Sequence, residues 1–210
     1  MGRGLFNVPK STRGGGDYMR SVYLRADGES CRIRFLTEAD DIFWAYFHQV
    51  TRGGRFAGWK ICLQEEAAQT CTFCDAGDTP KLQFLAWAYE IDHFYTAKPE
   101  RLESEAVRVG RSTLYRAVVN EPRLMRYAAS HLDTSGIGVQ AERRGTLLGR
   151  TYDWIRQGTG LDTTYNLTAS EEQDHPIDFP DVSSLPDLED VAFGRVESLG
   201  EAKEPAAQEP

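Results

Sequence analysis

The feature that most constrains the fold of this chain is a group of one histidine and three cysteines between residues 48 and 74. Thirteen residues separate His48 from Cys62, eight separate Cys62 from Cys71, and two separate Cys71 from Cys74 in the motif CTFC. The short gap lets a tight turn direct both sulfurs at one ion, and the longer gaps suit a β-hairpin that brings two more ligands to the same point. Three thiolates and one imidazole complete a tetrahedral set, so we expect one structural Zn²⁺ with no open coordination position.

Two other interpretations of these cysteines are open. A lone CxxC motif also occurs as a redox pair, and free cysteines are often small buried core residues. Three of the four cysteines fall within thirteen residues, near a histidine on a strand-like run, and this clustering favours metal in a cytosolic protein. The fourth, Cys31, lies among alternating apolar residues and is expected to be a core thiol. His93 is the rival to His48 as a ligand, but its place on a long strand indicates a satisfied surface residue.

The charge of the chain is divided unevenly between a body and a tail. The net charge is −8, and residues 171–210 hold twelve acidic and two basic residues, which leaves residues 1–170 at +2. We therefore expect a flexible, Gly-rich basic arm over residues 1–16, a folded body over 17–170, and an acidic disordered tail over 171–210. No apolar run approaches about twenty residues and no apolar signal segment is evident, so we expect a cytoplasmic protein without membrane association.

Hydrophobic alternation predicts a mainly β fold with a few helices. Strands are expected over residues 17–50 (three strands), 82–97, 102–109 and 152–169. Ser112 as an N-cap and Pro122 in a first turn predict two helices, over residues 112–120 and 122–133. Residues 48–80 would form a zinc-binding subdomain within this body.

Cations and aromatic residues lie close together between the first two expected zinc ligands. Arg52 and Arg55 flank a Gly-Gly pair, and Trp59 and Lys60 follow in the same stretch. One interpretation is a hairpin tip with solvated charges and one packed tryptophan. The other is a surface where cations meet phosphates and rings stack on bases, and we favour it because a bound metal would stiffen the loop. The candidate nucleic-acid contacts are Arg34, Trp44, Tyr46, Arg52, Arg55, Trp59 and Lys60, with Arg111, Trp154 and Arg156 as second choices.

The order of these features resembles a known family. A strand–hairpin–strand start, the His–x13–Cys–x8–Cys–x2–Cys spacing, the RQGTGLDTTY hairpin and the acidic tail are similar to the zinc-containing single-stranded DNA-binding proteins of tailed phages. These are the helix-destabilising proteins of the T-even type and their actinophage relatives, and the segment FCDAGDTPKLQFLAWAYEID resembles the actinophage form. The resemblance covers roughly residues 17–170 and is specific mainly at the metal site.

The resemblance implies a fold and a set of partners. The fold would be an OB-like five-stranded barrel with an inserted zinc subdomain, and the ligands carry over onto His48, Cys62, Cys71 and Cys74. Single-stranded DNA would lie in a basic, aromatic cleft. The basic arm would serve self-association along DNA, although residues 1–16 hold no clear copy of the family's basic cooperativity motif. The acidic tail, residues 171–210, would contact replication and recombination proteins.

The function expected from these observations is binding, not catalysis. The chain would coat and protect single-stranded DNA in phage replication, recombination and repair, in the host cell cytoplasm and without strong sequence specificity. We find no triad-like arrangement and no carboxylate pair suited to acid–base chemistry, so no enzyme activity is expected. Two alternatives stay open: a zinc-ribbon adaptor that binds a replication or transcription protein, and a zinc hydrolase or nuclease with only three protein ligands.

Overall fold

The structure is a computed structural model that describes residues 21–100, 102–173 and 177–195. The basic arm expected over residues 1–16 and the end of the expected tail lie outside the described residues. The described part is mainly β with few helices, which confirms the predicted class. None of its helices is long and apolar enough to span a membrane. The elements in chain order, with η for a 3₁₀-helix, are β1 (Ser30–Phe35), η1 (Ala39–Asp41), β2 (Phe43–Arg52), β3 (Arg55–Ile61), α1 (Leu63–Ala67), α2 (Thr72–Asp75), β4 (Lys81–Tyr95), β5 (Glu105–Val109), β6 (Ser112–Ala128), α3 (Ser130–Thr134), α4 (Ile137–Arg144), β7 (Thr151–Gln157), η2 (Gly160–Asp162), β8 (Thr164–Ala169), η3 (Val182–Ser184) and α5 (Leu188–Phe193).

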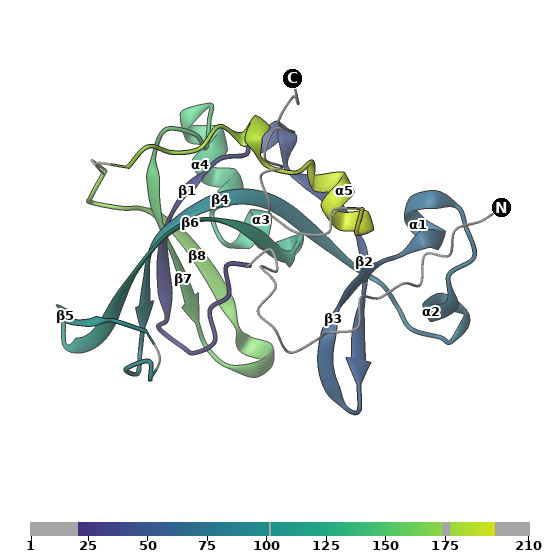
Figure 1. Cartoon of the computed structure of the whole chain (residues 1–210), viewed down its shortest axis with the longest axis horizontal. Helices are drawn as coiled ribbons and strands as arrows, with labels where there is room; N and C mark the ends of the chain where they lie inside the picture. Colours follow the sequence, from purple (N-terminus) through teal and green to yellow (C-terminus); the bar gives the residue numbers. More distant parts are fainter. Residues whose placement is uncertain (1–20, 101, 174–176, 196–210) are drawn as a thin grey trace, which may run out of the picture.

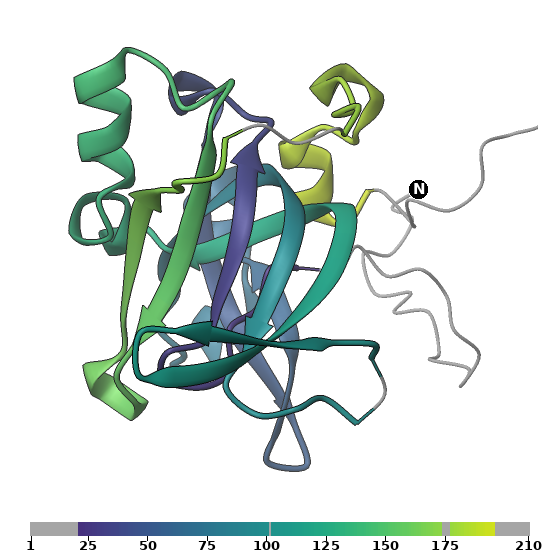
Figure 2. The same ribbon diagram turned by 90° about the vertical axis from the view of Figure 1, so that its left-hand side faces the viewer.

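The strands of the described chain form one open antiparallel sheet of eight strands (Figure 1, Figure 2). The order along the main path is β3-β2-β4-β1-β7-β8, while β6 pairs with β4 and β5 pairs with β6. The centre of the sheet is β4, because its first residues pair with β2, its later residues with β1, and most of its length with β6. From Gln83 to His93 every residue of β4 is buried.

The helices predicted over residues 112–120 and 122–133 are wrong, because the strand β6 occupies most of this stretch. Its seventeen residues pair with β4 and β5. This long-range pairing outweighs the local capping signals, since the preference for a strand depends on packing against neighbours. Pro122 is tolerated opposite Tyr89, next to a register shift in β4. Ser130–Thr134 is the helical part of the second predicted helix, and the sequence interpretation did not foresee α4.

The inner face of the sheet carries the main apolar core. Phe84 of β4, Phe35 of β1 and Trp154 of β7 are fully buried there, and Ile137 of α4 packs against the same cluster. Cys31 has no exposed surface in this inner core, which confirms the expected core thiol. Successive residues of a strand point to opposite faces, so the residues between these must face the other side of the sheet.

That opposite face carries a second cluster, which we call the outer cluster. Its buried members are Leu36, Ala45, Phe47, Ile61, Leu85, Trp87, Tyr89, Ile91, Leu124, Leu188, Val191 and Ala192. The last three belong to α5, and their spacing places them on one side of the helix. Asp187 caps the start of α5 by accepting hydrogen bonds from two N–H groups, and Gly194 ends it in a left-handed conformation. The outer cluster therefore joins the C-terminal helix to the sheet.

The packing of α5 differs from the disordered tail expected over residues 171–210. Ile177, Phe179 and Leu185 also pack against the outer cluster, and the indole N–H of Trp87 donates to the carbonyl of Pro186 at 2.9 Å. In Figure 1, α5 lies over β4 beside β2, and it contacts both β2 and β3. The stretch SLPDLEDVAFG sets a few apolar residues among acidic ones, a pattern that suits a short docked peptide. These apolar residues lie at helical spacing, and their burial orders this short segment against the outer cluster.

Candidate metal centre and nucleic-acid interface

Two hairpin strands and two short helices bring the histidine and three cysteines together. His48 lies on β2, and the N–H of Cys62, just past β3, donates to a β2 carbonyl at 2.8 Å. The following helix α1 ends after five residues at Ala68, which adopts the left-handed conformation and reverses the chain. Cys71 then occupies the N-cap position of α2, and Cys74 lies in that helix. The chain thus leaves the hairpin and returns to its base within a few residues.

The ligand atoms of His48, Cys62, Cys71 and Cys74 lie within 4.8 Å of one another. The Sγ atoms of Cys62 and Cys74 are 3.5 Å apart, and Nε2 of His48 lies 3.4 Å from Sγ of Cys71 and 3.5 Å from Sγ of Cys74. Zinc bonds of about 2.0–2.3 Å give a tetrahedron with edges of roughly 3.3–3.8 Å. The four residues predicted from the sequence therefore converge at a spacing that fits one metal ion, and all but Cys74 are buried.

Neighbouring side chains fix the orientation of the histidine. Asp78 lies 2.8 Å from Nδ1 of His48, so Nδ1 carries the proton and Nε2 faces the thiols. The ring of Phe73 stacks on the imidazole with centroids 5.1 Å apart. A carboxylate on the second nitrogen of a metal-binding histidine is the usual way proteins orient that ligand. This arrangement supports a structural metal.

The two cysteines of the CTFC motif differ in acidity. Burial raises the pKa of Cys71, but backbone hydrogen bonds from Cys74, Phe73 and Leu63 outweigh it and lower this pKa to about 6. Burial, with hydrogen bonds and charge from Cys62 and Cys71, raises the pKa of Cys74 to about 12. Thiolates this close repel one another, so a cation must neutralise them before all three ionise. Metal binding would release protons and would weaken as the pH falls.

The β2–β3 hairpin carries most of the candidate nucleic-acid contacts. Arg52 and Lys60 are exposed, and the Trp44 side chain at the start of β2 is 62% exposed. Trp59 is half-buried and meets the exposed ring of Phe56 edge-on, with centroids 5.8 Å apart. The sequence interpretation did not include Phe56 among the contacts, although it lies in the same stretch. Exposed rings beside exposed cations are the groups that hold single strands.

The other predicted nucleic-acid contacts differ in how free their side chains are to bind. Arg55 begins β3 at the hairpin tip, and Tyr46 on β2 is half-buried. Arg156 donates to the carbonyl of Leu24 at 2.8 Å and to the hydroxyl of Thr163 at 3.2 Å, so much of its guanidinium is already engaged.

Two of the second choices lie away from the hairpin. Trp154 has no exposed surface and stacks on Tyr165 in the inner core with centroids 5.3 Å apart. A side chain without exposed surface cannot stack on a base, so Trp154 is removed from the candidate contacts. Arg111 is exposed in the turn between β5 and β6, at the end of the molecule opposite α1 and α2 (Figure 1).

Two arginines lie on the outer face of the sheet. Arg34 was predicted from the sequence as a nucleic-acid contact, and Arg126 was not. The Arg34 guanidinium lies 4.1 Å from the ring centroid of Phe179, and burial lowers its pKa. Arg126 lies over the ring of Phe47 at 5.0 Å, and burial lowers its pKa to about 10. Neither has a carboxylate within ion-pair distance among the described residues. Arg126 was missed because residues 122–133 were taken for a helix, whereas strand alternation with Leu124 would have placed it on this face.

A buried charged cluster surrounds His93, so the expectation of a surface histidine is wrong. Nε2 of His93 lies 2.9 Å from Glu29, and Nδ1 lies 2.7 Å from Glu90, which also pairs with Arg123. Burial lowers the pKa of His93, but the hydrogen bonds that its ring donates to Glu29 and Glu90 outweigh burial and raise the pKa to about 9. A register shift in β4 between Glu90 and Asp92 turns Glu90 and His93 to the same side. The alternation of residues along a strand does not predict that shift, so the charged cluster around His93 could not be found from the sequence.

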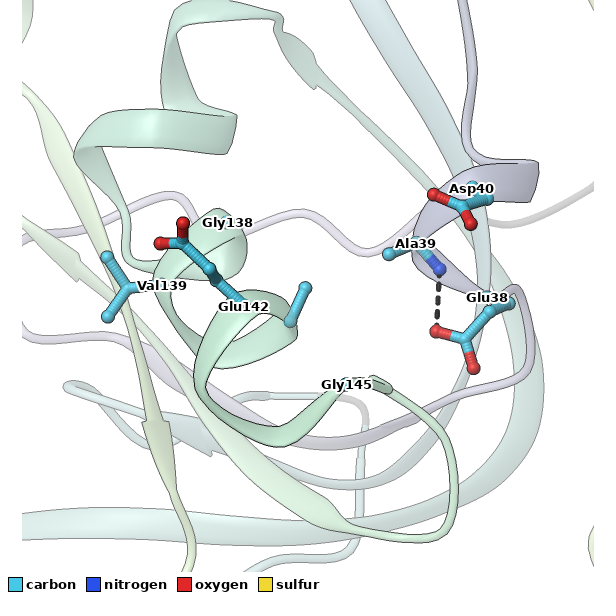
Figure 3. A pocket seen from close by; sticks show the side chains of 8 residues that line it. Glu38, Ala39, Asp40, Gly138, Val139, Glu142 and Gly145 are labelled. Carbon is cyan, nitrogen blue, oxygen red and sulfur yellow. Dashed lines mark hydrogen bonds between the residues drawn. The ribbon is translucent and has the colours of Figure 1, made fainter.

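A cavity of about 580 Å³ lies between η1 and α4 (Figure 3). Its lining includes Glu38, Asp40 and Glu142. The Glu38 carboxylate already accepts hydrogen bonds from the N–H groups of Ala39 and Leu147, so it is satisfied within the fold. The acidic lining makes this cavity unsuited to a nucleic-acid backbone.

A comparison of the chain with protein-family models, curated proteins and solved structures gives no match.

Proposed function

We propose that this protein binds single-stranded DNA, in the manner of the zinc-containing phage proteins that the sequence resembles. It would coat and protect the strand in replication, recombination and repair, without strong sequence preference and without catalysis. The observation that carries the proposal is the β2–β3 hairpin, where exposed cations and rings are held at the base by the buried His48–Cys62–Cys71–Cys74 group.

The ion that we propose for this group is one structural Zn²⁺. Three sulfurs and one imidazole nitrogen are the donors that zinc accepts in structural sites, whereas magnesium and calcium take oxygen. With four protein ligands the ion has no open position for water or substrate, which counts against a hydrolase or nuclease. Zinc would here cross-link the ends of the hairpin to α1 and α2.

The sheet has features that support an OB-like barrel as its ancestral core. The strands β1, β4, β6, β7 and β8 carry the side chains of the inner core. The β2–β3 hairpin with α1 and α2 forms one continuous insertion between β1 and β4. We propose that this insertion is the zinc subdomain of the family.

Phosphate neutralisation and base stacking would supply the binding energy. Arg52, Arg55 and Lys60 would meet phosphates, while Trp59 and Phe56 would stack on successive bases, each stacked base contributing about 1–3 kcal/mol. Because every base has an aromatic face, such a surface tolerates any sequence.

The C-terminal segment would limit access to this surface. α5 contacts β2 and β3; Asp187 is its N-cap, and Glu189 and Asp190 lie in its first turn. Arg34 donates to the carbonyl of Gln173 and lies over the ring of Phe179, so both residues cover it. We propose that the acidic segment within residues 171–210 competes with DNA and contacts replication and recombination proteins when released.

Titration of the zinc-loaded protein with poly-dT at two salt concentrations tests the proposal. We expect quenching of the fluorescence of Trp44 and Trp59, and an affinity that falls steeply as salt rises. Absence of quenching, or an affinity that ignores salt, would contradict DNA binding. Capture of a replication or transcription protein without any affinity for oligonucleotides would support the zinc-ribbon adaptor instead.

A truncation tests the role of the C-terminal segment separately. Deletion of residues 171–210 should tighten binding of poly-dT, most at low salt, because it removes a net charge of −10. The deletion also exposes the outer cluster, so the variant Leu188→Ser, which releases α5 and keeps every charge, serves as its control. If the truncated protein binds poly-dT more tightly and Leu188→Ser does not, the effect comes from the charge of the segment. If both proteins bind poly-dT as the parent does, the segment does not compete with DNA.

A further inference from the structure

The β5–β6 ribbon stands apart from the rest of the sheet. β5 pairs with β6 and with no other strand of the described residues, so one of its edges is free within that part of the chain. In Figure 1 this ribbon lies at the end of the molecule opposite α1 and α2. A free edge presents unpaired backbone N–H and C=O groups to any strand that approaches it.

One face of this ribbon carries several aliphatic side chains beside the Glu105–Arg116 ion pair, and two of them are largely exposed. The register pairs Val107 with Leu114 and Val109 with Ser112, so these side chains share a face with Val118. Val109 is 55% exposed and Val118 is 65% exposed. Soluble monomers rarely place several large aliphatic side chains together on a free edge ribbon, because such edges associate.

The turn of the ribbon determines which backbone groups point outward. Gly110 and Arg111 form a two-residue turn between the paired residues Val109 and Ser112. In an antiparallel ladder closed in this way, backbone groups point alternately toward the partner strand and away from it. The N–H and C=O groups of Ala106 and Arg108 are therefore those directed away from β6.

We propose that β5 pairs with β5 of a second copy of this chain, antiparallel and about a two-fold axis at Val107. In this register Ala106 lies opposite Arg108 of the second copy, and their outward backbone groups form the hydrogen bonds. Val107 lies opposite itself, at a position without backbone hydrogen bonds where side chains approach most closely. The two faces that carry these valines then merge into one surface across four strands.

Charge favours this register over its neighbours. Four residues from Val107 in either direction, this register brings the exposed Glu103 opposite the exposed Arg111 of the second copy. Because the contact is two-fold, this pair of opposite charges occurs at both ends of the interface. A shift by one pair in one direction sets Arg108 against itself, which is repulsive. A shift in the other direction sets both Val107 and Val109 opposite glutamates, Glu105 and Glu103. The proposed register sets only Val109 opposite a glutamate, Glu105, and keeps Glu103 opposite Arg111. Charge therefore favours this register over its two neighbours, and a two-fold contact of this kind closes as a dimer.

A cysteine at the axis tests the geometry directly. The variant Val107→Cys, kept zinc-loaded and free of DNA, should form a disulfide-linked dimer under mild oxidation. The matched control is Thr113→Cys, which lies on the exposed part of β6 away from the free edge, where two copies stay too far apart to bridge. We expect Val107→Cys to cross-link about tenfold faster or more than the control.

A second variant removes the pairing between copies without breaking the hydrogen bonds between β5 and β6. Ala106→Pro deletes an N–H that points outward, a place where edge strands tolerate proline. Sedimentation of the otherwise unaltered chain should show a dimer at high concentration, and Ala106→Pro should weaken it by about tenfold or more with an unchanged melting temperature. Ala106→Ser should sediment like the parent.

Three results would overturn the proposal. One is a parent chain that stays monomeric at every concentration. Another is a Val107→Cys variant that cross-links no faster than Thr113→Cys. The last is a dimer that survives Ala106→Pro, because that dimer would use another surface. None of these measurements involves DNA, so their outcome is independent of the DNA-binding proposal.

Discussion

The β2–β3 hairpin and the β5–β6 ribbon both extend from the ends of the sheet, but they are held in different ways (Figure 1). The first is fixed at its base by the His48–Cys62–Cys71–Cys74 group and by contact with α5. The second is held by the pairing of β6 with β4 and by ion pairs: Arg116 of β6 lies 2.9 Å from the buried Asp92 and 3.2 Å from Glu105. The first region is fixed by a group of candidate metal ligands, and the second by strand pairing and a charged network.

Their exposed side chains differ as well. The β2–β3 hairpin shows aromatic rings and cations, whereas the apolar residues of the β5–β6 ribbon are aliphatic. Rings suit flat bases, and aliphatic strand edges suit other strands. The difference suggests a division of labour, with nucleic acid at one end of the molecule and protein at the other.

Loss of the metal should have the largest effect, and only on the first of these regions. Cys71→Ser leaves three ligands and removes a buried thiol whose pKa is lowered to about 6, so it should release zinc and lower the free energy of unfolding by several kcal/mol. Affinity for poly-dT should fall together with stability, because the hairpin no longer holds its surface. A metal assay and a denaturant titration measure the first two effects, and a poly-dT titration measures the third. Cys31→Ala is the control, since it removes a buried thiol and should retain one zinc per chain. If Cys71→Ser binds poly-dT as tightly as the parent, the metal is not needed to hold the DNA-binding surface in place.

Loss of one ring should have a moderate effect. Trp59→Ala should weaken poly-dT binding by about 1–3 kcal/mol, because it removes a stacking surface and an edge contact with Phe56. Val118→Ala, an equally simple truncation on the other ribbon, should leave poly-dT binding unchanged. Titrations of both variants at one salt concentration make the comparison. Equal losses in the two variants would contradict the division of labour.

The last expected effect varies with pH and concerns the charged network around His93. His93 has a pKa raised from 6.5 to about 9 in the folded protein. Its contribution to stability is therefore complete below about pH 6.5 and is lost as the pH rises through about 9; the full shift corresponds to at most about 3 kcal/mol. His93→Gln should be less stable than the parent at pH 6 and nearly equal to it above pH 9. The measurement is denaturant unfolding at a series of pH values. A constant difference between the two proteins across this range would mean that the charge of His93 does not matter.

The metal centre was predictable from the sequence because its signal is local. Ligand identity and spacing are written in residues 48–74, and a hairpin with a tight knuckle is the natural way to fold that spacing. The zinc ion itself remains a prediction. The alternation of apolar residues in β1 and β4 likewise predicted strands correctly, since period-2 patterns have few other interpretations.

Other features depend on contacts between distant residues and left no local signal. Ser112 and Pro122 predicted helices in the residues of β6, but pairing with β4 makes this stretch a strand. The burial of His93 depends on a register shift in β4, and that of Trp154 on the closure of the inner core. The order of α5 depends on an outer cluster whose other members come from residues 36–124. Composition alone assigned that segment to a disordered tail.

The position of β4 between three neighbours determines how the molecule exchanges its amide hydrogens with solvent. Its buried residues from Gln83 to His93 are enclosed by β2, β1 and β6, so their amides should exchange only when the whole domain opens. The Gly53–Gly54 turn and the free edge of β5 should exchange within the earliest time points. A ligand bound at either end would therefore slow amide exchange only in that hairpin or ribbon. The amides of β4 exchange slowly with or without a ligand, so they provide a reference rate for both regions.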